Sequence, residues 1–95
     1  MKKIVTTQSV DIALRTLYEN DRRKVNAWFD HLCNWDHDQY VRRRSHSLAE
    51  LPGVYLLKTN SDFRIFFRID DDTITILDIT TKQTLLAFSH SAGNG

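Results

Sequence analysis

The hydrophobic period of this chain changes at about residue 53, and this change constrains the fold more than any other feature of the sequence. Beyond that point apolar and polar residues alternate with a period of two, which is typical of strands that bury one face. Three segments follow this pattern: GVYLLKT (53–59), FRIFFRI (63–69) and TITILDI (73–79). Because only short polar turns separate them, we predict a three-stranded antiparallel meander.

Before residue 34 the apolar residues instead recur every three or four positions, as on one face of a helix. After a short β-branched strand at residues 4–6, two such stripes predict a pair of helices. The first stripe comprises Val10, Ala13, Leu14, Leu17 and Tyr18, and the second comprises Val25, Trp28, Phe29 and Leu32. We expect Thr7 or Ser9 to cap the first helix and Asp21 to cap the second. The polar stretch from 34 to 47 is predicted to be a connector.

The order of these segments, β-α-α-β-β-β, predicts an α+β fold. The N-terminal strand and the helical hairpin should pack on one face of an antiparallel sheet and leave the opposite face open. A chain of 95 residues suffices for one domain with a single core, so we assign residues 1–95 to one domain. Residues from about 90 to the end are expected to form a flexible tail.

The cysteine content and the lack of long apolar runs indicate a cytoplasmic protein. Cys33 is the only cysteine, which excludes an internal disulfide and any multi-cysteine zinc site. The sequence shows no signal-peptide core and no run long enough to span a membrane, so we expect no membrane partner. It also contains no glycine-rich phosphate loop, nucleophile elbow or HExxH motif, so we expect neither a cofactor nor a metal.

Charge is segregated along the chain, although the formal net charge is only +1. The strand at residues 63–69 places its aromatic and aliphatic core residues on one side and Arg64, Phe66 and Arg68 on the other. Guanidinium groups on a rigid open face suit phosphate, because the planar fork donates two parallel hydrogen bonds. The basic residues Lys58, Arg42, Arg43 and Arg44 would extend such a patch.

The same residues also have simpler interpretations. An open sheet face must be solvated, and charged side chains protect a sheet from aggregation. If the turn at residues 70–72 contains three residues, Arg64 faces Asp78 and the two form a cross-strand ion pair. If the turn is shorter, Arg64 faces Leu77 instead.

The C-terminal half carries a recognisable order of motifs. A leucine, a glycine and an aromatic residue open one strand, a lysine follows, and an aromatic-Arg-aliphatic-x-aromatic segment precedes an acidic turn and an aliphatic strand. These are Leu51, Gly53, Tyr55, Lys58, Phe63, Arg64, Ile65, Phe67, the turn at 70–72 and the strand at 74–79. In this order the run from about 48 to 88 resembles the RelE/ParE superfamily of bacterial toxins from toxin–antitoxin pairs. The N-terminal strand and helical hairpin extend the resemblance over nearly the whole chain.

In its RelE-like branch, the resemblance implies an endoribonuclease that enters the ribosomal A site and cuts messenger RNA without a metal. Arg64 matches the family's phosphate-binding arginine, and Lys58 matches a basic position on the preceding strand. Lys82 is the basic residue nearest to the place of a late family arginine. His46 and His90 are the candidates for the base and the acid, because histidine exchanges protons near neutral pH.

Departures from the family pattern keep other functions open. Leu56 stands where some relatives carry a second lysine, and Phe88 stands where many catalytic members have tyrosine or histidine. ParE-like relatives share the fold, lack the ribonuclease residues and bind DNA gyrase. A degenerate toxin that acts only as an antitoxin-bound regulator is a third alternative. Each of these implies a cognate antitoxin protein as partner, and the RelE-like branch adds the ribosome and messenger RNA. The sequence leaves open whether two copies form a homodimer.

Overall fold

The structure of the protein is a computed structural model, and it describes residues 1–84. The predicted flexible tail and His90 lie outside the described residues. The elements, in chain order, are β1 (Lys3–Thr6), α1 (Gln8–Thr16), α2 (Glu19–Cys33), α3 (Gln39–Arg43), β2 (Ser45–Ser47), β3 (Val54–Lys58), β4 (Phe63–Asp70) and β5 (Thr73–Thr81). Across residues 1–84, no helix combines the length and the apolar character needed to cross a membrane.

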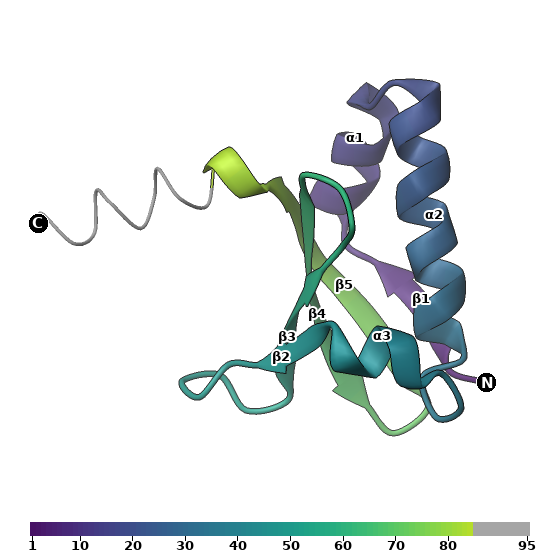
Figure 1. Ribbon diagram of the computed structural model, residues 1–95, viewed down its shortest axis with the longest axis vertical. Coiled ribbons are helices and arrows are strands. Elements are labelled where there is room, and N and C mark those ends of the chain that lie inside the picture. Colours follow the sequence, from purple (N-terminus) through teal and green to yellow (C-terminus); the bar gives the residue numbers. More distant parts are fainter. Residues whose placement is uncertain (85–95) are drawn as a thin grey trace, which may run out of the picture.

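The strands form one five-stranded sheet in the order β1-β5-β4-β3-β2 (Figure 1). Strands β3 to β5 pair antiparallel, which confirms the predicted three-stranded meander. Strand β2 adds a further antiparallel strand beside β3, whereas β1 pairs parallel to β5. The prediction of a purely antiparallel sheet was therefore wrong. Two parallel strands need a long connection, and here the connection is the whole segment from the end of β1 at Thr6 to the start of β5 at Thr73.

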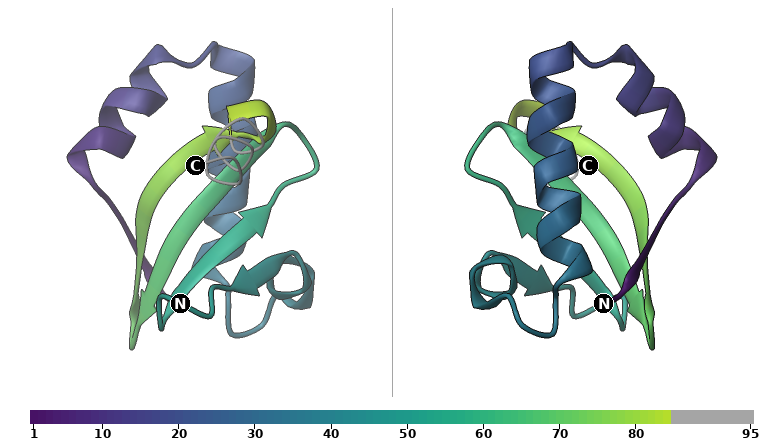
Figure 2. Two further views of the ribbon diagram at one scale, coloured as in Figure 1. Left: turned by 90° about the vertical axis from the view of Figure 1, so that its left-hand side faces the viewer. Right: turned by 90° about the vertical axis from the view of Figure 1, so that its right-hand side faces the viewer.

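The helices pack on one face of the sheet and build the core there (Figure 2, right). The buried side chains of this core come from both layers: Val10, Val25, Trp28, Leu32, Val41, Leu57, Ile65, Phe67, Ile74 and Ile76. The predicted helical stripes and the apolar strand faces thus meet as expected, except that Tyr18 of the first stripe is 83% exposed. Seen from the other side, no helix of the described residues covers the sheet (Figure 2, left). The expected two-layer arrangement is confirmed for this part of the chain.

The helix starts match the sequence only in part. Thr7 caps α1, as predicted, by accepting a hydrogen bond on its side-chain oxygen from the Val10 N–H at 3.3 Å. The second helix begins three residues earlier than a cap at Asp21 implies, at Glu19, and its N-cap residue Tyr18 provides no side-chain bond. Asp21 was predicted as this cap and lies instead in the first turn, where its negative charge complements the helix dipole.

The predicted connector between 34 and 47 was wrong, because it contains both α3 and β2. Asp38 caps α3 by accepting a hydrogen bond from the Val41 N–H at 3.0 Å, and Val41 is completely buried in the core. Strand β2 then adds to the edge of the sheet by pairing Ser45 with Leu57 and Ser47 with Tyr55. Elements of five and three residues are too short to show a hydrophobic period, which explains why the sequence did not reveal them.

The hairpin between β4 and β5 sets the register of the arginine strand. Its turn consists of two residues, and the first, Asp71, has a φ of 40°, in the left-handed region that aspartate tolerates better than most residues. The partners change from Phe66 opposite Asp78 to Phe67 opposite Ile76, so Leu77 is the extra residue of a β-bulge. Arg64 consequently lies opposite Thr80. Both predicted registers, opposite Asp78 or Leu77, were wrong, because a short turn and a bulge act together.

Candidate functional site

The uncovered face of the sheet carries its side chains in rows that cross the strands, because cross-strand partners point to the same face. We define these rows by their members on β4. The Arg64 row consists of Lys58, Arg64 and Thr80. The Phe66 row consists of His46, Leu56, Phe66 and Asp78. The Arg68 row consists of Val54, Arg68, Thr75 and Val5.

Arg64 is half-buried and tethered at one end of its guanidinium. Its Nη1 donates to the carbonyl oxygens of Ser61 at 3.0 Å and of Phe63 at 2.9 Å. Among residues 1–84, no carboxylate forms a salt bridge with Arg64; the ion pairs found there lie elsewhere on the protein. An arginine has five N–H donors, so this geometry fixes the side chain and leaves donors available for an anion.

The turn between β3 and β4 holds the acceptors of Arg64 in place. Thr59, only 3% exposed, donates its hydroxyl to the Phe63 carbonyl at 2.6 Å and accepts from the Ser61 N–H at 3.3 Å. At the other side of the turn, the Lys82 N–H donates to the Asp62 carbonyl at 2.6 Å. The turn is thereby tied both to itself and to the end of β5, which restricts where the Arg64 guanidinium lies.

Lys58 is the exposed last residue of β3 and stands directly opposite Arg64. Its backbone is bonded on both sides to Arg44: the Lys58 N–H donates to the Arg44 carbonyl at 2.9 Å, and Arg44 Nε donates to the Lys58 carbonyl at 2.7 Å. The Arg44 guanidinium also lies over the rings of Trp28, at 5.9 Å, and Tyr40, at 5.7 Å. Arg44, predicted as an RNA contact, therefore has its guanidinium engaged within the protein, where it positions Lys58.

The remaining predicted residues are distributed over several surfaces. His46 is exposed on β2 and is a diagonal neighbour of Lys58, about 7–8 Å away between Cα atoms. Arg68 is exposed on the same face. Arg42 and Arg43 lie on α3, where they line a surface hollow with Gln39.

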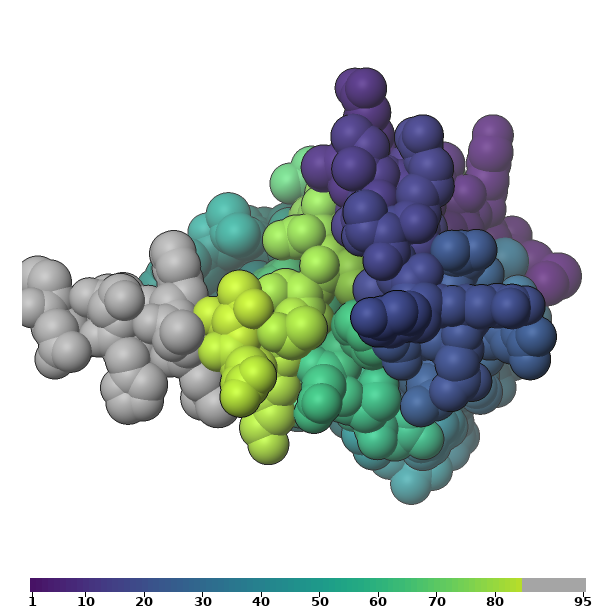
Figure 3. Space-filling view, turned by 90° about the horizontal axis from the view of Figure 1, so that it is seen from above, coloured from purple at the N-terminus to yellow at the C-terminus, as the bar shows by residue number. Residues whose placement is uncertain are grey.

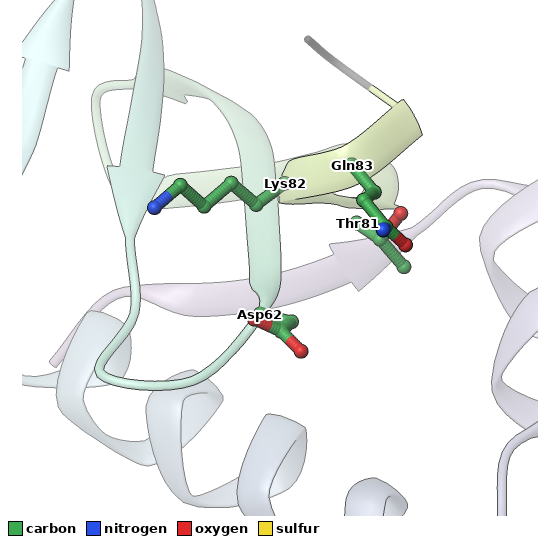
Figure 4. A pocket seen from close by; sticks show the side chains of 4 residues that line it. All are labelled: Asp62, Thr81, Lys82 and Gln83. Carbon is green, nitrogen blue, oxygen red and sulfur yellow. The ribbon is translucent and has the colours of Figure 1, made fainter. Parts of the chain in front are cut away.

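A pocket lies at the end of β5. It is lined by Asp62, Thr81, Lys82 and Gln83 (Figure 4). The Lys82 side chain extends away from Asp62 in this view. From above, the end of β5, in yellow, lies beside the green turn between β3 and β4 (Figure 3). Since Thr80 of the Arg64 row is two residues before Lys82, the predicted late cation stands at the same end of the sheet as Arg64.

The structure also reveals residues that the sequence analysis did not assign to the site. The role of Thr59 could have been predicted, because the turn before the arginine strand, TNSD, contains two hydroxyl side chains that can bond to the backbone. Phe66 and Leu56 lie on the uncovered face, and neither they nor the bulge residue Leu77 belong to the core cluster. The alternation of the strand identified that face, but the sequence did not show that the face has an apolar cluster of its own.

The clearest electrostatic perturbation lies on the helix side. A hydrogen bond from the Val41 N–H, reinforced by the His31 side chain at 2.6 Å from Asp38, holds the pKa of the Asp38 carboxyl below its usual range. Asp38 thus joins the end of α2 to the start of α3. Within residues 1–84, no group of three or more histidine, cysteine or acidic side chains is arranged to hold a metal ion.

The sequence matches no family model, and no curated protein is significantly similar to it. Solved structures do match. The RelE–RelB toxin–antitoxin complex of E. coli superposes with a TM-score of 0.70 at 12% identity, over 85% of this chain and 96% of that chain. The isolated E. coli RelE toxin superposes with a TM-score of 0.69 at 12% identity, over 85% of this chain and 84% of that chain. The archaeal RelE–RelB complex of Pyrococcus horikoshii superposes with a TM-score of 0.66 at 17% identity, over 84% of this chain and 93% of that chain.

These likenesses show that the chain has the RelE fold, which confirms the fold that the motif order predicted.

Proposed function

We propose that this protein is the toxin of a toxin–antitoxin pair and that it cleaves messenger RNA on the ribosome. The observation that carries the proposal is the pair of cations Lys58 and Arg64, opposed on the uncovered face of a RelE-like fold with no carboxylate partner among residues 1–84. Side chains directly opposite on antiparallel strands have Cβ atoms about 4.5–5.5 Å apart, so one phosphate can contact both.

The proposed reaction is an attack by the ribose 2′-oxygen on the adjacent phosphorus. The new bond joins the 2′-oxygen to phosphorus, and the bond between phosphorus and the 5′-oxygen breaks, which leaves a 2′,3′-cyclic phosphate and a 5′-hydroxyl. Arg64 and Lys58 hold the phosphate and stabilise the charge that develops on its oxygens. Lys82, at the same end of the sheet, adds a further cation.

Two proton transfers accompany this attack. One group must take the proton from the 2′-hydroxyl, and another must give a proton to the departing 5′-oxygen. We assign one of these roles to His46, which is exposed on the same face as Lys58. His90 is proposed for the other role on the basis of the sequence alone. Arg68, with Arg42 and Arg43 on α3, is proposed to contact RNA phosphates outside the cleavage site.

The proposed partners follow from the same surface. Two of the matched structures contain a RelB antitoxin bound to RelE, and we propose a cognate antitoxin for this chain as well. An acidic segment of such a partner would neutralise Lys58 and Arg64 and block access to RNA. Action on ribosomes would place the protein in the cytoplasm.

The test is messenger cleavage in a purified translation system, with and without ribosomes, by the native protein and by Arg64→Ala. We expect cuts that require ribosomes and that disappear in the variant. A folded native protein that leaves messenger intact but blocks DNA supercoiling by gyrase would instead establish a ParE-like binding function. Inactivity in both assays, with tight antitoxin binding, would indicate a regulator without toxin activity.

A further inference from the structure

The centre of the uncovered face is apolar, although the residues around it are basic. Phe66 lies between Arg64 and Arg68 on β4, and all three side chains point to this face. On one side Phe66 pairs with Leu56; on the other it faces the bulge of β5, where Leu77 and Asp78 oppose a single residue. None of Leu56, Phe66 and Leu77 belongs to the core cluster beneath the helices. Phe66 is only partly exposed.

We propose that Phe66 is a stacking platform for one unpaired RNA base, with Arg64 and Arg68 holding the phosphates on either side of it. This inference rests on the proposed function and adds to it a base-binding subsite. The Cα atoms of Arg64 and Arg68 are roughly 13 Å apart in an extended strand, with Phe66 midway. Their long side chains can both reach toward a nucleotide that lies over the ring.

The charges on this face favour RNA over an uncharged apolar partner. Lys58, Arg64 and Arg68 surround the ring on the sheet rows defined above, and His46 lies at the end of the Phe66 row. Asp78 is the carboxylate of that row, and its side chain accepts a hydrogen bond from the Ile79 N–H at 2.9 Å. Single-stranded nucleic acid offers both a negative backbone and π faces, which matches cations placed around an aromatic ring on a sheet.

The bulge gives this arrangement a structural cause. A β-bulge increases the local twist of its strand and changes the direction of nearby side chains. Here it sits directly across from Phe66, so two β5 residues support one position on β4. The two-residue turn and the bulge together place Thr80 opposite Arg64, and Asp78 is the diagonal neighbour of Arg64 in the Phe66 row. The register therefore gives Arg64 no directly opposed carboxylate, and the bulge places two β5 residues opposite the Phe66 position.

The direct test uses a seven-nucleotide oligouridine with a central 2-aminopurine, whose fluorescence falls when the base stacks. Native protein and Phe66→Tyr should bind it and quench the signal. Phe66→Leu should bind about 5- to 100-fold more weakly and leave the bound base fluorescent, because base–aromatic stacking is lost. The slope of log affinity against log salt should stay the same in Phe66→Leu, whereas Arg64→Ala should flatten it by about 0.7 for one lost phosphate contact.

A probe without a central base tests the platform independently of any change in the protein. Replacing the 2-aminopurine by an abasic residue should weaken binding to the native protein by the same factor as Phe66→Leu, and should not weaken binding to Phe66→Leu further. If circular dichroism shows that Phe66→Leu is poorly folded, the comparison of the two probes on the native protein is still a valid test of the platform. Equal affinity of native protein for the two probes, or binding without quenching, would overturn the platform.

The two proposals fail in different ways. Native protein that quenches the probe but does not cut messenger contradicts the proposed nuclease and leaves the platform intact. Ribosome-dependent cutting by Phe66→Leu at the native rate and at the native positions overturns the platform and leaves the nuclease intact. If Phe66→Leu keeps RNA quenching but loses affinity for the antitoxin, the apolar centre is a protein interface and the RNA assignment is wrong.

Discussion

Lys58 and Arg64 stand directly opposite each other on β3 and β4, on the sheet face that no described helix covers. Like charges at directly opposed positions destabilise a sheet. Across residues 1–84 no carboxylate forms an ion pair with either residue, so the repulsion is not compensated there. The phosphate of the proposed RNA substrate would turn this repulsion into shared attraction.

Removing one charge of this pair should therefore stabilise the protein and inactivate it. Lys58 is exposed, so Lys58→Gln removes little packing. We expect the free energy of unfolding in urea to rise by roughly 0.2–1 kcal/mol at low salt, and this gain to shrink as salt screens the charges. Messenger cleavage should fall about 100-fold or more, as when a group that stabilises transition-state charge is removed.

Lys3→Gln on β1 is the matched control, because it removes one exposed lysine of the same sheet far from the Arg64 row. It should leave cleavage unchanged. A loss of stability in Lys58→Gln would mean that the lysine is held by favourable contacts and that the pair does not destabilise the fold.

The buried hydroxyl of Thr59 should matter for activity as well as for stability. Thr59→Val keeps the shape of the side chain but removes the hydroxyl that binds the Ser61 N–H and the Phe63 carbonyl. We expect a loss of roughly 1–3 kcal/mol in the free energy of unfolding. Since Ser61 also accepts from Arg64, cleavage measured well below the melting temperature should fall too.

Thr75→Val is the matched control for Thr59→Val. Thr75 is a half-buried strand residue on the uncovered face of the sheet, opposite Arg68. This variant should retain both stability and cleavage. Native cleavage by a destabilised Thr59→Val would show that the turn does not position Arg64.

The sequence predicts most of the two-layer fold but not the details that form the site. Hydrophobic period identified α1, α2 and the β3–β5 meander, because each of these helices contains at least two turns and each of these strands at least five residues. Register depends on a single inserted residue, and nothing in TITILDI distinguishes Leu77 as the bulge. The hydrogen bond from Arg44 to Lys58 joins residues that are distant in sequence, so no local pattern predicts it. A run of arginines also has the same sequence whether its side chains are solvated or, like Arg44, lie over the ring of Trp28.

Acid should weaken the junction between α2 and α3 through Asp38. The pKa of Asp38 is lowered in the folded protein, first by the bond from the Val41 N–H and then by His31, so the folded state binds its proton less readily than the unfolded chain. The stabilisation from this carboxylate is present above the unfolded pKa of about 3.9 and is lost as pH falls through the lower folded value. Asp38→Ala should cost about 1 kcal/mol at neutral pH as the cap is lost.

Asp38→Asn separates the cap from the charge. Asparagine is an equally good cap, so this variant should keep most of the neutral-pH stability. Its free energy of unfolding, measured in urea from pH 7 to pH 2, should depend less on pH than that of the native protein. An identical pH dependence in both proteins would show that Asp38 does not cause the acid sensitivity.

His46 gives the sharpest test of proton transfer on the uncovered face. It is exposed on β2 next to β3, and diagonal to Lys58, so its imidazole lies within reach of a ribose whose phosphate contacts Lys58 and Arg64. We expect His46→Ala to reduce single-turnover cleavage on ribosomes by about 100- to 10,000-fold, the usual contribution of a positioned acid or base. The exposed residue contributes little packing, so the melting temperature should not change. Added free imidazole should restore part of the rate, because it supplies the missing proton acceptor or donor.

The control is His37→Ala, because His37 is an exposed histidine between α2 and α3; this variant should cleave at the native rate. Native rates in both His46→Ala and His90→Ala would remove histidine from the mechanism and leave proton transfer to the lysines of the site.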